Sequence, residues 1–271
     1  MVTWILQTDI FEENLTKLKD EIVKQGHYYS FAKYIPFSEK QDFPDVKPAG
    51  PVIFYGSLNM AAKIRKATNW IPGVWCNLEK MKCTSYYPYY GKYLINNDYT
   101  IIPFGELERL KPRLFERFGL NGDIFIRPDS PSKIFSGGLL GKSESLGHFL
   151  ANSVVFPEEL CIISSPKQIF AEWRLVVCNG EIITGSQYHK NGLLETNKEF
   201  STEVTRFGYE VIKEWQPESC FVLDLGETQN GYGLVEINSF SCSGYYDCEL
   251  SEIVKHASTQ AEIEFNDIFN A

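Results

Sequence analysis

The pair Asn179-Gly180 restricts the fold of this chain more than any other feature of its sequence. It lies between two apolar runs, residues 175–178 and 182–183. Asn-Gly in this setting is the strongest short-range signal for a β-hairpin, because both residues tolerate the backbone of a tight turn. The sequence therefore predicts that a strand with Glu172 and Arg174 on one face folds back onto a strand that carries Gln187 and His189.

A different pattern fills the first third of the chain. Short apolar strands at residues 3–7 and 51–56 each run into a helix, at residues 11–25 and 57–68, and the first of these helices repeats its apolar positions every 3.6 residues. An extended aromatic segment at residues 27–34 stands between them. This order predicts a small parallel α/β domain, and its glycines lack the spacing of a dinucleotide-binding loop.

From about residue 100 the pattern changes to short strands with few helices. We expect an N-terminal α/β domain over residues 1–100 and an α+β domain over residues 101–271. The strands expected in the second domain are residues 123–127, 160–164, 169–177, 181–188, 221–225 and 233–238, and a helix over 250–269 closes the chain.

The charge balance argues against one broad class of partner. The 271 residues carry a formal net charge of −9 and give a pI near 5.1, so the chain lacks the general attraction to phosphate backbones that nucleic-acid binding needs. The basic run at residues 63–66 fits a solvated helix face. No apolar run is long enough to span a bilayer, and the N-terminus lacks the basic region of a signal peptide. We expect a cytoplasmic protein that binds neither nucleic acid nor membranes.

The seven cysteines show no Cys-x-x-Cys spacing, and no paired histidines accompany them. A zinc site or a disulfide framework is therefore not predicted. Free thiols in a reducing compartment explain the cysteines better.

A strand that ends at Arg127 leads into a turn that contains Lys133, and prolines 128 and 131 prevent its continuation. Ser136, Gly137 and Gly138 follow, and the two glycines allow a close approach of the backbone to a ligand. Arg and Lys around such a turn can hold phosphate oxygens; the alternative is an exposed charged turn. The run at residues 137–143 resembles a P-loop but is one residue too short.

A second group of polar residues lies on the last two predicted strands. Glu236 and Asn238 alternate on one face, and Asp224 lies at the end of the preceding strand, with residues 226–233 as the connecting turn. Two carboxylates and an amide oxygen are hard ligands suited to Mg²⁺. The alternative is a polar strand edge.

The third group is Glu172 and Arg174. An arginine here can stabilise the charge that develops on a transferred phosphoryl group. The alternative is an ion pair at the surface.

Taken in this order, the segments resemble the ATP-grasp superfamily, and most closely its small clade named for two arginines and one lysine. The resemblance rests on the runs IRPDSPSKIFSGG, AEWRLVV and VEINSFSCSGYYDCEL and covers roughly residues 100–271. It implies an ATP-grasp fold, preceded by the α/β domain that such enzymes usually carry. The chain differs from better-known members in using Arg127 where many have lysine, and it has residues 187–190 (Gln-Tyr-His-Lys) where several peptide ligases place arginines.

The resemblance also implies roles for individual residues. Arg127 and Lys133 would hold the ATP phosphates, with Ser136, Gly137 and Gly138 in a flexible loop. Arg174 would contact the γ-phosphate of ATP or the acyl phosphate. The remaining expected contacts are adenine at Cys161, Ile162 and Ile163, ATP at Glu172 and Arg174, catalysis at Arg174 and Lys133, and Mg²⁺ at Asp224, Glu236 and Asn238.

The activity implied is that of an ATP-dependent carboxylate–amine (or carboxylate–thiol) ligase that forms an acyl phosphate and releases ADP. Its partners would be small-molecule or peptide carboxylates and amines. Two alternatives stay open: a protein that binds Mg-ATP without ligase turnover, and a phosphotransferase that acts on a hydroxyl group. An amine requirement for ADP release would separate them.

The loop after the metal strand, residues 239–248, is expected to bind the substrate. Its hydroxyl and backbone donors suit a carboxylate or a tetrahedral intermediate, and Asp247 suits an amine. The alternative is an ordinary loop. The residues expected to contact substrate are Ser241, Ser243, Gly244, Tyr245 and Asp247.

Overall fold

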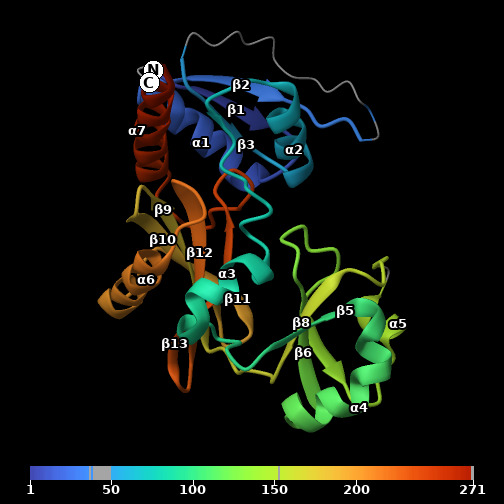
Figure 1. Ribbon diagram of the computed structural model, residues 1–271. Helices are drawn as coiled ribbons and strands as arrows, with labels where there is room; N and C mark the ends of the chain where they lie inside the picture. The colour runs from blue at the N-terminus through green and yellow to red at the C-terminus, as the bar shows by residue number, and fades with distance from the viewer. Residues whose placement is uncertain (37, 39–49, 152, 270–271) are drawn as a thin grey trace. The chain divides into compact units, whose positions relative to one another are not determined.

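The computed structural model describes residues 1–36, 38, 50–151 and 153–269 (Figure 1). The chain forms two compact units that are interleaved in the sequence. Unit 1 consists of residues 1–77, 171–225 and 236–271, and unit 2 of residues 78–170 and 226–235. These compact units do not coincide with the two domains expected on either side of residue 100. The domain boundary at residue 100 stays a prediction.

A four-stranded parallel sheet opens unit 1, in the order β2-β1-β3-β4. Its strands are β1 (Thr3–Gln7), β2 (Tyr28–Ala32), β3 (Val52–Tyr55) and β4 (Pro72–Gly73). Helix α1 (Glu12–Lys24) buries Leu18 and Ile22, and helix α2 (Leu58–Ala67) begins after Ser57, whose hydroxyl accepts from the backbone nitrogen of Met60. The predicted parallel α/β segment is confirmed.

A five-stranded sheet follows, in the order β11-β10-β9-β12-β13. The strands are β9 (Ala171–Cys178), β10 (Glu181–Lys190), β11 (Leu193–Asn197), β12 (Cys220–Thr228) and β13 (Gly231–Ser239), and helices α6 (Thr202–Glu214) and α7 (Leu250–Phe269) accompany them. Asn179 and Gly180 have φ values of 51° and 78°, and β9 pairs antiparallel with β10. The predicted hairpin is confirmed.

Strands β12 and β13 are longer than the sequence predicted, because the expected turn over residues 226–233 is mostly strand. Gly226 and Gly233 lie inside the strands and pack against Ile95. A Cβ atom would lie 2.7 Å from Ile95 Cδ1 at Gly226 and 2.5 Å from Ile95 Cγ1 at Gly233. These glycines therefore permit close packing and do not form the turn.

The core of unit 1 includes one face of strands β9 and β12. Val176 and Val222 belong to it together with Cys178 and Cys220, which form a disulfide with a Cα–Cα distance of 4.2 Å. The expectation of free thiols is wrong for this pair, because neighbouring strands place the two cysteines opposite each other. The other five cysteines are free.

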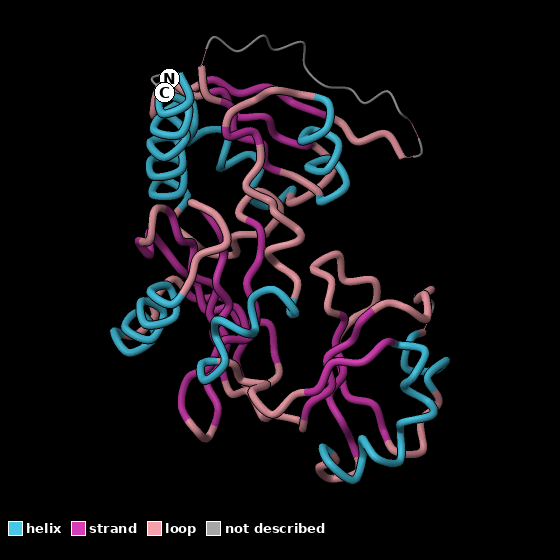
Figure 2. The backbone as a smooth tube through the Cα atoms, in the orientation of Figure 1, coloured by secondary structure: helices cyan, strands magenta, loops and turns pink. Residues whose placement is uncertain are grey.

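Unit 2 contains an antiparallel sheet in the order β5-β8-β6-β7. Figure 2 shows its strands in magenta. The strands are β5 (Thr100–Pro103), β6 (Asp123–Pro128), β7 (Gly138–Gly141) and β8 (Leu160–Ser164). The helices are α3 (Cys83–Tyr90), η1 (Gly91–Tyr93), η2 (Phe104–Glu106), α4 (Leu107–Phe118) and α5 (Leu146–Leu150). No helix in the described part of the chain has the length and apolar character needed to cross a membrane.

Candidate active site

Arg174 on β9 and Asp224 on β12 form a buried ion pair with two hydrogen bonds. The distances are 2.9 Å from Arg174 Nε to Asp224 Oδ1 and 2.7 Å from Arg174 Nη2 to Asp224 Oδ2. Arg174 Nη1 also donates to the carbonyl oxygen of Gly244, at 2.8 Å. Asp224 is 1% exposed and Arg174 8%, so this pair is shielded from solvent, unlike the surface pair that was the alternative.

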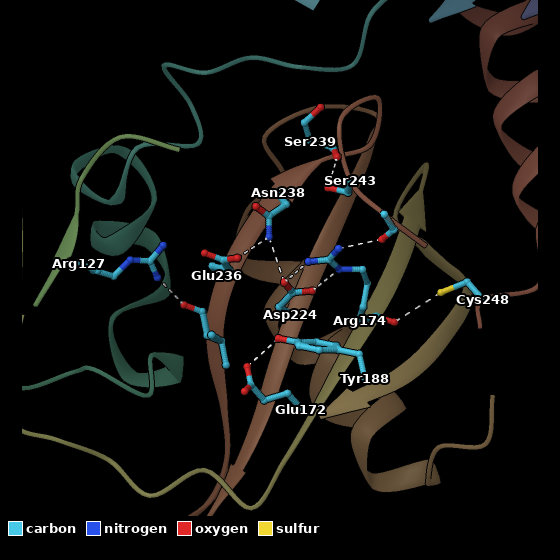
Figure 3. Close-up of polar contacts among 12 residues, drawn as sticks. Arg127, Glu172, Arg174, Tyr188, Asp224, Glu236, Asn238, Ser239, Ser243 and Cys248 are labelled. Carbon is cyan, nitrogen blue, oxygen red and sulfur yellow. Dashed lines mark hydrogen bonds and ion pairs between the residues drawn. The ribbon is translucent and has the colours of Figure 1, made fainter. Parts of the chain in front are cut away.

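Asn238 joins Asp224 to Glu236 (Figure 3). Its amide nitrogen donates to Asp224 Oδ2 at 3.1 Å and to Glu236 Oε1 at 2.9 Å. The structure thus brings together the three residues expected to bind Mg²⁺. Within the described residues no group of three His, Cys, Asp or Glu side chains is placed to hold a metal ion, so a site here depends on the amide oxygen as well as the two carboxylates.

Two tyrosines that the sequence did not assign to the site contact Arg174. The rings of Tyr188 and Tyr246 stack with a centroid distance of 4.8 Å, and the Arg174 guanidinium lies 5.6 Å and 5.0 Å from the two centroids. Tyr188 also donates to Glu172 Oε2 at 2.7 Å. These contacts hold the guanidinium through cation–π attraction and fix Glu172 beside it.

The place of Tyr188 in the site could not be predicted, because two irregularities shift the register between β9 and β10. His189, and not Gln187, pairs with Glu172, with a shift between Gln187 and His189. A regular hairpin counted from the Asn-Gly turn would place Tyr188 on a different face. The aromatic character of this residue was visible in the sequence, but its position was not.

Burial and the neighbouring charges together shift the pKa values in this cluster. Burial raises the pKa of Glu172, and the hydrogen bond from Tyr188 opposes the rise. Burial also raises the pKa of Tyr188. For Arg174, desolvation lowers the pKa, but the Asp224 carboxylate outweighs it and raises the pKa above the usual value. Arg174 therefore stays charged at any pH that the folded protein meets.

His189 adds a second unusual group next to Glu172. Its Nδ1 atom is buried, lies 3.4 Å from Glu172 Oε1 and makes no hydrogen bond within the described residues. A buried ring nitrogen without a hydrogen bond is uncommon in proteins. The ring of His189 therefore lies against the Glu172 carboxylate at this edge of the cluster.

The expected phosphate turn lies in unit 2. Arg127 lies near the end of β6, and its Nη1 atom donates to the carbonyl oxygen of Val235 at 3.0 Å. Lys133 has a φ of 50°, and its backbone nitrogen donates to the carbonyl oxygen of Ser130 at 3.3 Å. A Cβ atom on Gly137 would lie 3.1 Å from Arg127 Cβ, so a glycine favours this approach. Ser136 precedes this glycine, and Gly138 begins β7.

The three residues expected to contact adenine lie inside β8. The backbones of Cys161, Ile162 and Ile163 pair with β5 on one side and with β6 on the other, and their side chains are fully buried. Their backbone groups are therefore used within the sheet. The segment that leaves the sheet is residues 165–170, and part of it lines a cavity of 510 Å³ together with the tip of the β12–β13 hairpin.

Three hydroxyl groups in the loop after β13 bind within unit 1 and shape the loop. Ser241, Ser243 and Tyr245 are buried, and each has a partner. Ser241 accepts from the backbone nitrogen of Trp75 (3.0 Å), Ser243 donates to the carbonyl oxygen of Ser239 (2.6 Å), and Tyr245 donates to that of Phe240 (2.9 Å). Of the five residues expected to contact substrate, Asp247 alone has a polar side chain without a hydrogen bond or an ion pair among the described residues.

A family model matches residues 108–256, more than half of the chain, and describes an ATP-grasp domain, family 2 of the clade named for two arginines and one lysine. This chain belongs to that clade of ATP-grasp proteins. The expected resemblance is confirmed. A search of curated proteins finds no match for this ATP-grasp protein.

Solved structures share the fold at low sequence identity. D-cycloserine synthetase DcsG has a TM-score of 0.65 and 11% identity, covering 96% of this ATP-grasp chain and 100% of its own. D-alanyl-alanine synthetase A from Vibrio cholerae has the same TM-score and identity, with coverage of 96% and 98%. The ATP-grasp ligase PsnB, in complex with a minimal precursor, has a TM-score of 0.59 and 12% identity, also covering 96% and 98%. The predicted ATP-grasp fold with an N-terminal α/β segment is confirmed.

Proposed function

We propose that this ATP-grasp protein is an ATP-dependent ligase that joins a carboxylate to an amine through an acyl phosphate. The observation that carries the proposal is a cluster in which the buried pair Arg174–Asp224 is bonded to the half-buried residues Asn238 and Glu236. The cluster combines a fixed cation with two carboxylates and an amide. Similar structures include D-alanyl-alanine synthetase A and the ligase PsnB with a precursor peptide and AMPPNP, and this similarity supports the proposal.

The donor set fits Mg²⁺. Asp224 and Glu236 offer carboxylate oxygens, and Asn238 already holds both within hydrogen-bonding distance. The amide of Asn238 carries an oxygen as well as a nitrogen, so it can also act as a ligand. Bound there, Mg²⁺ would neutralise charge on the ATP phosphates. A PsnB structure contains Mg and ADP, which supports the same cofactors here.

For ATP itself we propose contacts in unit 2. Arg127 and Lys133 would hold phosphate oxygens, and the turn at residues 136–138 would close on them. The base would bind in the 510 Å³ cavity beside residues 166–168. Its wall offers the amides of Gln168, Gln229 and Asn230, which can donate to and accept from an adenine edge.

The reaction then asks for positioning and charge compensation. A substrate carboxylate oxygen attacks the γ-phosphorus, and ADP leaves. The amine nitrogen next attacks the acyl carbon, and the carbon–oxygen bond to phosphate breaks. An ammonium and the acyl phosphate together give the amide, hydrogen phosphate and one proton. Arg174 would stabilise the negative charge on the transferred group, and Asp247 would bind the ammonium.

A screen for ADP release tests the proposal. The protein is incubated with Mg-ATP and pools of carboxylates and amines, and products are identified by mass. We expect ADP release that needs both components and an amide whose mass equals their sum minus water. ADP release without an amine requirement, or a stable phosphorylated alcohol, would contradict the proposal, and the second result would show a phosphotransferase.

A further inference from the structure

A small cavity lies in unit 1 beside the loop that joins β13 to α7. Its volume is 190 Å³, and its wall comes from α1, from residues 246–251 and from Lys198. At about 30 Å³ for each water molecule in the liquid, the cavity has room for about six waters. That volume suits one or two small amino-acid residues and is too small for a nucleotide.

Three polar side chains on this wall make no hydrogen bond or ion pair in the described part of the chain. They are an amide, an ammonium and a carboxylate: Asn14, Lys17 and Asp247. Other charged groups on the wall are already paired, since Lys198 lies 3.2 Å from Glu249 and Glu21 lies 3.1 Å from Lys24. The groups open to a ligand therefore carry one positive charge, one negative charge and one neutral dipole.

The cavity adjoins the Arg174 cluster. Tyr246 contributes to the cavity wall, and its ring centroid lies 5.0 Å from the Arg174 guanidinium. Asp247 is the next residue, and its backbone nitrogen donates to the hydroxyl of Ser186 on β10 at 3.4 Å. The cavity that Asp247 lines thus shares Tyr246 with the residue proposed to stabilise the acyl phosphate.

We propose that this cavity binds a small zwitterion, an α-amino acid or a very short peptide. Its ammonium group donates to Asp247, its carboxylate accepts from Lys17, and Asn14 adds a hydrogen bond. A ligand with a single charge would leave either Lys17 or Asp247 without a counter-charge, so a zwitterion complements this wall better. The role of this ligand as the amine acceptor rests on the proposed ligase function, but its binding does not.

Binding is measured by calorimetry on the full chain without ATP, so that turnover plays no part. The probes are the common α-amino acids and their homodipeptides, which distinguish the two sources of the zwitterion. For each probe that binds, the affinities of its C-terminal amide and of its N-acetyl derivative are then measured. We expect at least one zwitterion to bind, and each derivative to bind about tenfold or more weakly, as for the loss of one charge-assisted hydrogen bond.

Three variants assign the contacts. Lys17→Met is expected to reduce the affinity for the zwitterion about tenfold or more and to leave the affinity for its C-terminal amide unchanged. Asp247→Asn is expected to weaken both. Lys19→Met is the matched control, because Lys19 lies on the same helix, pairs with Asp20 at 3.0 Å and does not line the cavity.

The inference is overturned if no amino acid or dipeptide binds, or if binding survives both Lys17→Met and Asp247→Asn. If a zwitterion binds but no ADP is released in the presence of carboxylates, the proposed binding site is supported and the proposed ligase function is contradicted. If the protein ligates amines that lack a carboxylate, and Lys17→Met does not affect this activity, the ligase function is supported and the proposed binding site is contradicted.

Discussion

Asp224 Oδ2 accepts hydrogen bonds from two residues of neighbouring strands, Arg174 Nη2 at 2.7 Å and Asn238 Nδ2 at 3.1 Å. One carboxylate oxygen thus connects the fixed cation on β9 with the polar face of β13. Asp224 is almost fully buried, so its charge depends on these partners. The proposed metal ligands and the proposed catalytic arginine are therefore linked through this one carboxylate.

The first prediction concerns the stability of this pair. Arg174→Ala leaves the Asp224 carboxylate buried without its main partner, and we expect it to reduce the free energy of unfolding by about 3–5 kcal/mol. Denaturant unfolding followed by circular dichroism measures the change. Arg109→Ala is the control, because Arg109 pairs with Glu106 at the surface and should cost about 1 kcal/mol or less. A loss as small as the control's would contradict a structural role for the Arg174–Asp224 pair.

The second prediction concerns metal-dependent binding of ATP. ATP should raise the melting temperature when Mg²⁺ is present and have little effect without it, because a ligand of the folded state stabilises that state. Glu236→Gln should remove most of the shift. Glu210→Gln should retain it, because Glu210 lies on α6, which carries none of the proposed ligands. A full shift in a well-folded Glu236→Gln protein would show that Glu236 does not bind the metal.

The third prediction concerns the phosphate contacts in unit 2. Arg127→Ala and Lys133→Ala should each weaken ATP binding about tenfold or more, since each removes a charged donor. Stability should change little, because Lys133 is exposed in a turn and Arg127 is only half-buried near the end of β6. Calorimetric titration with Mg-ATP measures the affinity, and Arg113→Ala on α4 serves as the control. Loss of folding in Arg127→Ala would instead make the bond from Arg127 to Val235 a structural requirement.

The fourth prediction follows from the raised pKa of Glu172, whose first cause is burial. The folded protein then holds a proton on Glu172 at pH values where the unfolded chain, with a pKa near 4.5, has released it. The contribution of Glu172 to stability must therefore fall as pH rises from 4.5 through the folded pKa. We expect the free energy of unfolding of the wild-type protein, relative to Glu172→Gln, to decrease over that range. A constant difference would show that Glu172 does not titrate abnormally.

Much of the architecture was predictable because local signals and packing agree. The Asn179-Gly180 turn and the alternation of Glu236 with Asn238 specify strands and faces without any knowledge of the fold. Register depends on side chains that lie far apart in the chain. The bulge next to Tyr188 and the close packing of Gly226 and Gly233 against Ile95 were therefore not predictable from local pattern.

The site shows the same division between local and distant information. Asp224, Glu236 and Asn238 could be grouped because two adjacent strands carry them. The approach of Arg174 to Gly244 needs a loop conformation that residue spacing does not reveal. The serine and tyrosine hydroxyls of that loop were predicted to contact substrate, and in the structure they bond to backbone groups. A sequence shows which residues carry a hydroxyl group, but it does not show whether that group bonds to the backbone or faces a ligand.

The transfer of a carboxylate oxygen to phosphate tests the proposed acyl phosphate most directly. A carboxylate substrate found in the ADP-release screen is labelled with oxygen-18 at both carboxyl oxygens, and the phosphate released during amide formation is analysed by mass. The account predicts one oxygen-18 atom in each released phosphate, because the attacking carboxylate oxygen leaves with phosphorus when the amine displaces it. Unlabelled phosphate accompanying amide formation would contradict the acyl phosphate and with it the mechanism proposed for this protein.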